Sequence, residues 1–138
     1  SISPFIPLIN KGLTKFQPVY VKDVAKAVHV VINNNKYIGQ TYSLGGPEVI
    51  SFKEIIDFIL LKIRKKRIYI PLSFPQIKLM AIFFSILPNA PITLDQVRLL
   101  EKDNIVLKKE KGFKELGIKP ASIYLSAEQY LNRYISRY

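Results

Sequence analysis

Three capping boxes mark where helices begin in this sequence. In each box a Ser or Thr precedes an apolar run, and a Glu or Gln follows three positions later. The pairs are Ser51 with Glu54, Ser73 with Gln76, and Thr93 with Gln96. Because the two side chains of such a box bond each other's backbone N–H groups, they predict helices over residues 52–63, 74–87 and 94–102. Apolar residues at helical spacing predict a further helix over 23–33 and a last one from Ala121 or Ser122 to about Ser136.

Short β-branched and aromatic runs separate these helices. The runs typical of strands are 16–21, 40–44, 67–70 and 105–107. Pro18 assigns the first run to an edge or an irregular position. Residues 1–15 predict a loop-like lead-in, and one turn over 113–116 ends at Gly117. No linker is long enough to divide the 138 residues, so we expect one α/β domain over 1–138 with few strands and about five helices.

Several residue types needed for common chemistries are scarce. The chain has no Cys, which excludes disulfides, thiolate catalysis and Cys-ligated metal sites. His29 is the single His, so no transition-metal site is expected. The carboxylates Asp23, Glu54, Asp57 and Asp95 lie near predicted helix starts, where the helix dipole stabilises them without a catalytic role.

The motifs that hold and use a dinucleotide are also missing. No glycine-rich turn of the G-x-G-x-x-G type follows a strand, although backbone amides need such a turn to approach a pyrophosphate. None of the eight Tyr residues has a Lys four positions later. We therefore expect no cofactor to bind this chain alone, and no catalysis by it.

Two features suggest an interaction surface. The formal net charge is +11, which favours acidic partners, and Arg64, Lys65, Lys66 and Arg67 form a cationic run. For that run, and for the second basic cluster within 108–114, the interpretation we favour over a contact surface is a solvated turn with cations near a helix end. Residues 77–87 are apolar around nearly the whole helix, with Ile77, Phe83 and Phe84 as candidate contacts, but the helix is too short to span a bilayer. Without interleaved aromatic residues, no nucleic-acid partner is expected.

The last helix carries tyrosines at every fourth position. Tyr130, Tyr134 and Tyr138 would therefore share one face. Packing against the domain or against a partner is the interpretation we favour for this face, rather than cofactor binding.

Four strings, in order along the chain, resemble a known family. They are KFQPVYVKDVAKA (15–27), GQTYSLGGPE (39–48), PITLDQVRLL (91–100) and LGIKP (116–120). Together they resemble atypical extended short-chain dehydrogenases/reductases of the NAD-dependent epimerase/dehydratase type. The variant most similar is the group that contains the nucleotide-binding accessory subunit of respiratory complex I.

The resemblance implies a particular place for this chain. It would be the C-terminal, substrate-side portion of a Rossmann-like protein, whose N-terminal half binds NAD(P) and is the missing partner. Gln17, Tyr20, Gly45, Gly46 and Pro47 would then line the substrate or nicotinamide end of a cleft. The alternative hypothesis is a basic interaction or assembly module that binds an anionic membrane surface or a respiratory-complex partner. We expect a cytoplasmic location, peripheral to a membrane under the alternative.

Overall fold

The computed structural model describes residues 4–84 and 94–135. These residues form two compact units, each assembled from separated stretches of the chain. Unit 1 contains the residues up to Lys15 together with Ser51–Asn104, and unit 2 contains Phe16–Ile50 together with the residues from Ile105 onward. The two-residue strands β2 (Lys15–Phe16) and β3 (Ile50–Ser51) lie where the chain passes from one unit to the other.

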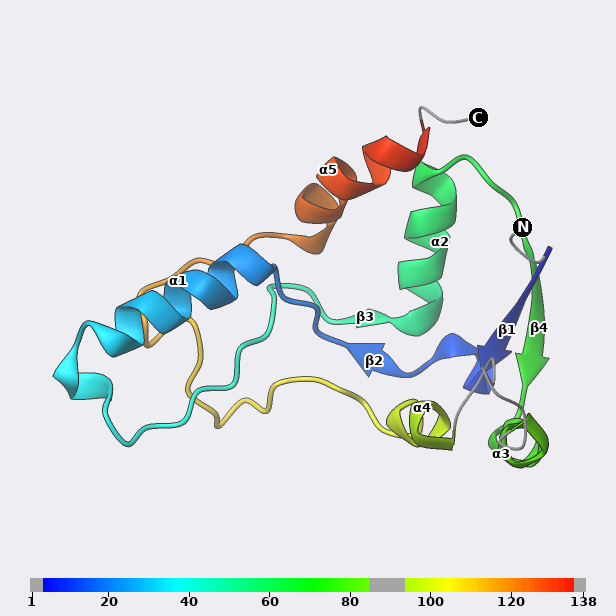
Figure 1. Ribbon diagram of the computed structural model, residues 1–138, viewed down its shortest axis with the longest axis horizontal. Helices are drawn as coiled ribbons and strands as arrows, with labels where there is room; N and C mark the ends of the chain where they lie inside the picture. Colours follow the sequence, from blue (N-terminus) through cyan, green and yellow to red (C-terminus); the bar gives the residue numbers. More distant parts are fainter. Residues whose placement is uncertain (1–3, 85–93, 136–138) are drawn as a thin grey trace. The chain divides into compact units, whose positions relative to one another are not determined.

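Unit 1 contains a pair of parallel strands and three helices. The strands are β1 (Phe5–Ile9) and β4 (Ile68–Leu72), paired from Phe5 opposite Ile68 to Ile9 opposite Leu72 (Figure 1). The helices are α2 (Phe52–Lys62), α3 (Phe74–Phe84) and α4 (Leu94–Leu99), with a short 3-10 turn, η1, at Asn10–Gly12. The core consists of Ile9, Ile77, Ala81 and Val97. It joins Ile9 of β1 to α3 and α4, and Leu72 of β4 packs against it.

Each strand of this pair carries a proline on its outer edge. The N–H of Ile68 donates to the carbonyl of Pro4, and in a parallel pair alternate residues make both of their bonds to the neighbouring strand. The backbone groups of Pro7 and Pro71 therefore point away from the partner strand. Since proline has no N–H, both outer edges of the sheet lack a donor at their centre, which disfavours the addition of a further strand.

Unit 2 is built mainly from helices and irregular segments. It contains α1 (Val21–Ile32), the 3-10 turn η2 (Asn35–Tyr37) and α5 (Ile123–Ile135). Its core consists of Ala27, Tyr37, Phe113 and Leu116. The predicted single turn over 113–116 is confirmed, and it ends at Gly117, whose φ of +68° suits a residue without Cβ.

The helix predictions agree with the structure to within a few residues. The box of Ser51 and Glu54 is present with both of its bonds, and Gln76 accepts the N–H of Ser73 at 2.9 Å. The predicted end of α3 at Leu87 and the predicted cap Thr93 lie outside the described residues. With five α-helices and few strands in the described ranges, the expected α/β class is confirmed.

The strand predictions were less accurate. Residues 1–15 are not a plain loop, because β1 pairs with β4. The run 16–21 is a strand only at Phe16, and β4 continues through Pro71. Residues 40–44 and 105–107 form no strand. Instead, Tyr42 and Leu44 pack on the core of unit 2 while Ser43 donates its N–H to the carbonyl of Lys111, so no ladder forms.

Candidate functional site

A buried carboxylate fixes the start of α1 in unit 2. Asp23 is 1% exposed, and its Oδ2 accepts the N–H of Ala121 at 2.7 Å while its Oδ1 accepts from the Lys26 ammonium at 2.9 Å. The bond from Ala121, followed by that from Lys26, lowers the pKa of Asp23 below its usual value. Asp23 therefore does more than complement the helix dipole, which was our expectation from sequence. It holds the segment before α5 against α1.

A second carboxylate fixes the start of α5. Glu48 Oε2 accepts the N–H of Ile123, the first residue of that helix, at 3.2 Å. An N–H in the first turn has no partner within its helix, so an acceptor from elsewhere in the unit stabilises it. Together, Asp23 and Glu48 determine where α5 begins.

Gln17 joins two other segments of unit 2. Its Nε2 donates to the carbonyl of Gly46 at 2.8 Å, and its Oε1 accepts the N–H of Val106 at 2.9 Å. Both ends of the amide are thus bound within the protein. Gln17 positions two loops, and this leaves little of its side chain for a ligand.

The two adjacent glycines are used for packing. A Cβ on Gly46 would lie 1.9 Å from the carbonyl oxygen of Pro18, and one on Gly45 would lie 2.6 Å from Cδ of Gln17. These close approaches are made by the chain itself, so the pair does not form an open cradle for phosphate. The Gly45–Gly46 pair is therefore not shaped to accept the pyrophosphate of a dinucleotide.

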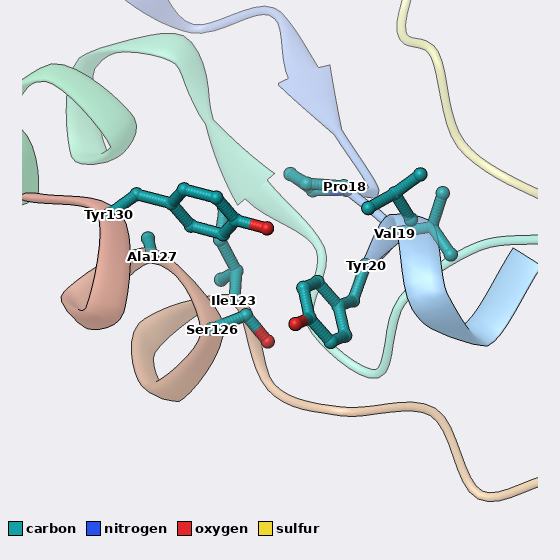
Figure 2. A pocket seen from close by; sticks show the side chains of 8 residues that line it. Pro18, Val19, Tyr20, Ile123, Ser126, Ala127 and Tyr130 are labelled. Carbon is teal, nitrogen blue, oxygen red and sulfur yellow. The ribbon is translucent and has the colours of Figure 1, made fainter.

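An apolar pocket of about 300 Å³ lies beside the start of α1 (Figure 2). One wall is the segment 18–21, and the other is a face of α5 whose residues recur at helical spacing. The lining residues are Pro18, Val19, Tyr20, Val21, Ile123, Ser126, Ala127 and Tyr130. Asp23 and Glu48 fix the α5 wall, because they hold the start of α5 and the segment before it.

The predicted cleft residues therefore have different surroundings. Gln17, Gly45 and Gly46 are brought together, but they contact one another and the backbone. Tyr20 lines the pocket, whereas Pro47 is exposed and lies outside its lining. The contribution of α5 was not predicted, although the spacing of Ile123, Ser126, Ala127 and Tyr130 indicates a shared face.

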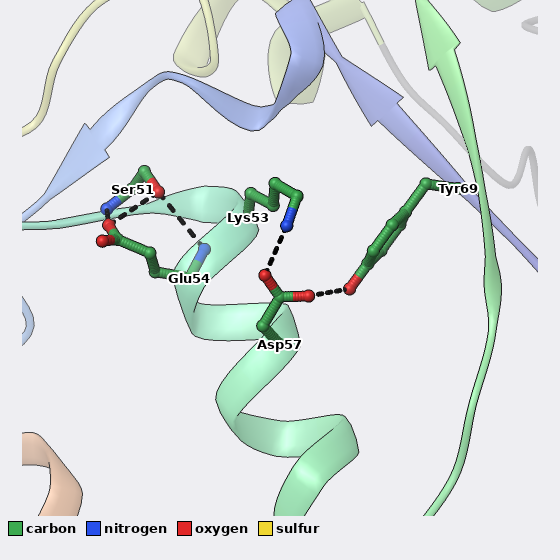
Figure 3. Close-up of polar contacts among 5 residues, drawn as sticks. All are labelled: Ser51, Lys53, Glu54, Asp57 and Tyr69. Carbon is green, nitrogen blue, oxygen red and sulfur yellow. Dashed lines mark hydrogen bonds and ion pairs between the residues drawn. The ribbon is translucent and has the colours of Figure 1, made fainter.

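Unit 1 contains a polar cluster between α2 and β4 (Figure 3). Asp57 accepts from the Lys53 ammonium at 2.6 Å and from the hydroxyl of Tyr69. The pKa of Asp57 is lowered, first by Lys53 and then by Tyr69. Burial, followed by the bond to Asp57, raises the pKa of Tyr69 to about 12. Tyr69 therefore stays protonated at neutral pH, and the cluster fastens α2 to β4 rather than supplying a general acid.

The basic run lies at the C-terminus of α2. Arg64 has a φ of +54°, its N–H donates to Leu61, and the N–H of Lys65 donates to Leu60. This pair of bonds is a Schellman motif, so the run ends the helix. Its role as a contact surface stays a prediction.

The apolar residues predicted as a contact surface on α3 are partly buried in the core and partly exposed. Ile77 is 0% exposed and belongs to the core of unit 1, so its side chain contributes no surface. Phe83 is 70% exposed, with Leu79, Met80 and Ile82 also exposed. The side chain of Phe84 lies outside the described residues.

No group of side chains within 4–84 and 94–135 is suited to hold a metal ion. His29 is exposed on α1, with its Nδ1 3.3 Å from Nδ2 of Asn33. In these ranges, no helix is long and apolar enough to cross a membrane.

No family model matches the sequence. Comparison with known proteins finds similar subunits of mitochondrial NADH dehydrogenase in several organisms. The chain is 36% identical over 140 residues to NADH dehydrogenase (ubiquinone) 1 alpha subcomplex subunit 9, mitochondrial, of Arabidopsis thaliana. It is 28% identical to the protein of that name in Rattus norvegicus, and 29% identical to the NADH-ubiquinone oxidoreductase 40 kDa subunit, mitochondrial, of Neurospora crassa. Each match covers 94% of this chain and 35% of the relative.

These matches confirm the resemblance drawn from the four strings. The chain spans about a third of the length of the curated relatives that it matches.

Proposed function

Because this chain is homologous over 94% of its length to a subunit of mitochondrial NADH dehydrogenase, we propose that it is part of an epimerase-like accessory subunit of a respiratory NADH dehydrogenase. In that protein it serves binding and assembly rather than catalysis. The main support is the spatial arrangement of the predicted cleft residues: Gln17, Gly45 and Gly46 are occupied with one another and with the backbone. Residues held in this way stabilise the local structure, and they are not available to bind or activate a substrate.

In this proposal, NAD(P) binds to a half of the protein outside this chain. An exposed apolar stripe on α1 supports such a partner half. Val21, Val28 and Ile32 lie at positions i, i+7 and i+11 and so share one face, and Val21 and Ile32 are 65% and 73% exposed. Another face, with Ala27, packs into the core of unit 2. Covering the stripe with an apolar surface of the nucleotide-binding half removes it from water.

Membership of the respiratory complex can be tested in native membranes. The whole protein is tagged, the membranes are solubilised gently, and complexes are separated on a native gel stained for NADH dehydrogenase activity. We expect the tag to migrate with the active band. Ile32→Glu should reduce the tagged protein in that band, because it puts a charge into the proposed contact between the two halves and so destabilises the subunit that joins the complex. Leu61→Glu is the matched control, on the exposed side of α2. A tag that migrates apart from the enzyme contradicts the proposal.

The cofactor assignment has a separate test. NADPH fluorescence is titrated with the whole protein and with the 138-residue chain, whose folding is checked by circular dichroism. Binding is expected only to the whole protein. Tight binding to the folded chain by itself would show that our account of the glycines is wrong.

The alternative function is an interaction module for an anionic membrane surface. The exposed side chains Leu79, Ile82 and Phe83 of α3 favour it, because apolar side chains in water are frequent at such contacts. Sedimentation with anionic vesicles at low and high salt tests it, since salt screens surface charge. Salt-sensitive binding that Phe83→Ser weakens, while Leu125→Ser on α5 does not, would support this alternative. No binding at low salt would remove it.

A further inference from the structure

The pocket beside α1 combines an apolar wall with hydroxyl groups. Tyr20 enters from the segment before α1, and Ser126 and Tyr130 enter from α5 (Figure 2). The oxygens of Tyr20 and Ser126 point toward one another across the pocket, and the hydroxyl of Tyr130 points into the space from the α5 side. The other lining residues are aliphatic.

These hydroxyls have hydrogen-bonding capacity to spare. Ser126 Oγ donates to the carbonyl of Ser122 at 2.9 Å, so its lone pairs can still accept. Among the residues whose side chains the structure describes, none forms a hydrogen bond with the hydroxyl of Tyr20 or of Tyr130. Two donors and several acceptors therefore face one apolar space.

Among the residues whose side chains the structure describes, no charged one lines this space. The nearby charges are already paired or lie outside it: Glu48 accepts the N–H of Ile123, Asp23 is buried against Ala121, and Lys22 lies 5.9 Å from the ring centroid of Tyr20 without lining the pocket. A charged ligand would lose its hydration without gaining a counter-charge, which is costly. The chemistry thus favours an uncharged ligand.

We propose that this pocket binds a neutral small molecule with an apolar, ring-sized body and a carbonyl group that accepts from the tyrosine hydroxyls. Its volume is at the small end of the range for ligand pockets, about 300 to 1,000 Å³. The converging hydroxyls favour a small molecule over an apolar protein segment. A segment that only packs against the pocket would bury three hydroxyl groups without offering them hydrogen-bond partners. The site is independent of the NAD(P) assignment, which concerns residues outside this chain.

Acetophenone is a suitable probe, with benzoate and benzylamine as charged probes of similar size. Ligand-observed NMR on the whole protein, with NADPH in excess to occupy any dinucleotide site, measures the three affinities. Acetophenone should bind at least about tenfold more tightly than either charged probe. Ala127→Leu, which fills the pocket, should abolish binding, and Tyr20→Phe should weaken it roughly three- to tenfold. Leu125→Phe, at an exposed position of α5, is the control and should leave it unchanged.

Each other result overturns the proposal. If acetophenone does not bind the whole protein, the space is closed there by another part of the protein. If Ala127→Leu leaves binding intact while circular dichroism shows a folded variant, the probe binds elsewhere. If benzoate binds as tightly as acetophenone, the ligand class is wrong. None of these results bears on migration with the NADH dehydrogenase, so the two proposals fail separately.

Discussion

The carboxylate of Asp23 accepts the backbone N–H of Ala121, 98 positions later in the chain. The same side chain is 1% exposed and is paired with Lys26. One short side chain therefore connects the start of α1 with the segment that leads into α5, and so determines the spacing of the pocket walls.

Replacing Asp23 by Asn should destabilise the protein by about 1–3 kcal/mol at pH 7, because a buried N–H loses a charged acceptor. The pKa of Asp23 is lower in the folded than in the unfolded protein, where it is about 3.9. Its contribution is thus fully present above about pH 4 and is lost as the pH falls through the folded value. Urea unfolding between pH 2 and pH 7 should show a shallower acid dependence for the variant. Asp95→Asn, in the first turn of α4 and exposed, is the control; an equal effect there would contradict a special role for Asp23.

Gly46→Ala should destabilise unit 2 by about 1–3 kcal/mol, because the added Cβ would lie 1.9 Å from the carbonyl oxygen of Pro18. The backbone must then shift, which disturbs the bond from Gln17 to Gly46. Chemical unfolding followed by circular dichroism measures the loss. Gly39→Asn is the control, since Asn tolerates the positive φ and no atom lies within 4 Å of a Cβ there. Equal stability of the Gly46 variant would show that the close approach is easily relieved.

Tyr69→Phe should cost about 1–2 kcal/mol, because the hydroxyl donates to the Asp57 carboxylate. Since the pKa of Tyr69 is raised to about 12, the hydroxyl stabilises the fold below about pH 10, and this stabilisation is lost as the pH rises toward 12. The variant should therefore lose less stability between pH 10 and pH 12 than the parent. A double-mutant cycle with Asp57→Asn should give a coupling of about 1 kcal/mol. Additive effects of the two changes would mean that the bond contributes nothing.

Pro71→Val should leave the free energy of unfolding within about 1 kcal/mol but increase self-association. The new N–H would complete a row of donors on the outer edge of β4, which invites pairing with another chain. Sedimentation velocity at matched concentrations detects this as a larger weight-average coefficient. Pro75→Ala, in the first turn of α3, removes a proline away from the sheet and should behave as the parent. If both variants associate alike, edge protection is not the reason.

The sequence was informative wherever the determinants are local. The box of Ser51 and Glu54 predicted the start of α2, and Gly117 predicted where the turn that begins at Phe113 ends. Such signals depend on residues three or four positions apart, which a helix always brings together. The four strings also showed the resemblance to the family without a structure.

The strands and the site depended on partners far away in the chain. Residues 40–44 have the composition of a strand but no strand forms, because a ladder needs a neighbour in register and Ser43 instead bonds Lys111. Phe5–Ile9 is a strand because Ile68–Leu72 lies beside it, despite the prolines that suggested a loop. Ile77 was a candidate contact residue in an apolar run, yet the core of unit 1 encloses it completely.

By itself, the sequence determined the helices, the charge and the relatives of this protein, since each follows from neighbouring residues or from the order of short strings. Only the tertiary structure decided that Gln17 and the two glycines pack against one another, that Asp23 holds Ala121, and that Tyr20 faces α5 across a pocket. The physical reason is that these contacts join residues roughly 30 to 110 positions apart. Whether such residues meet depends on how the whole unit packs, which no local pattern specifies.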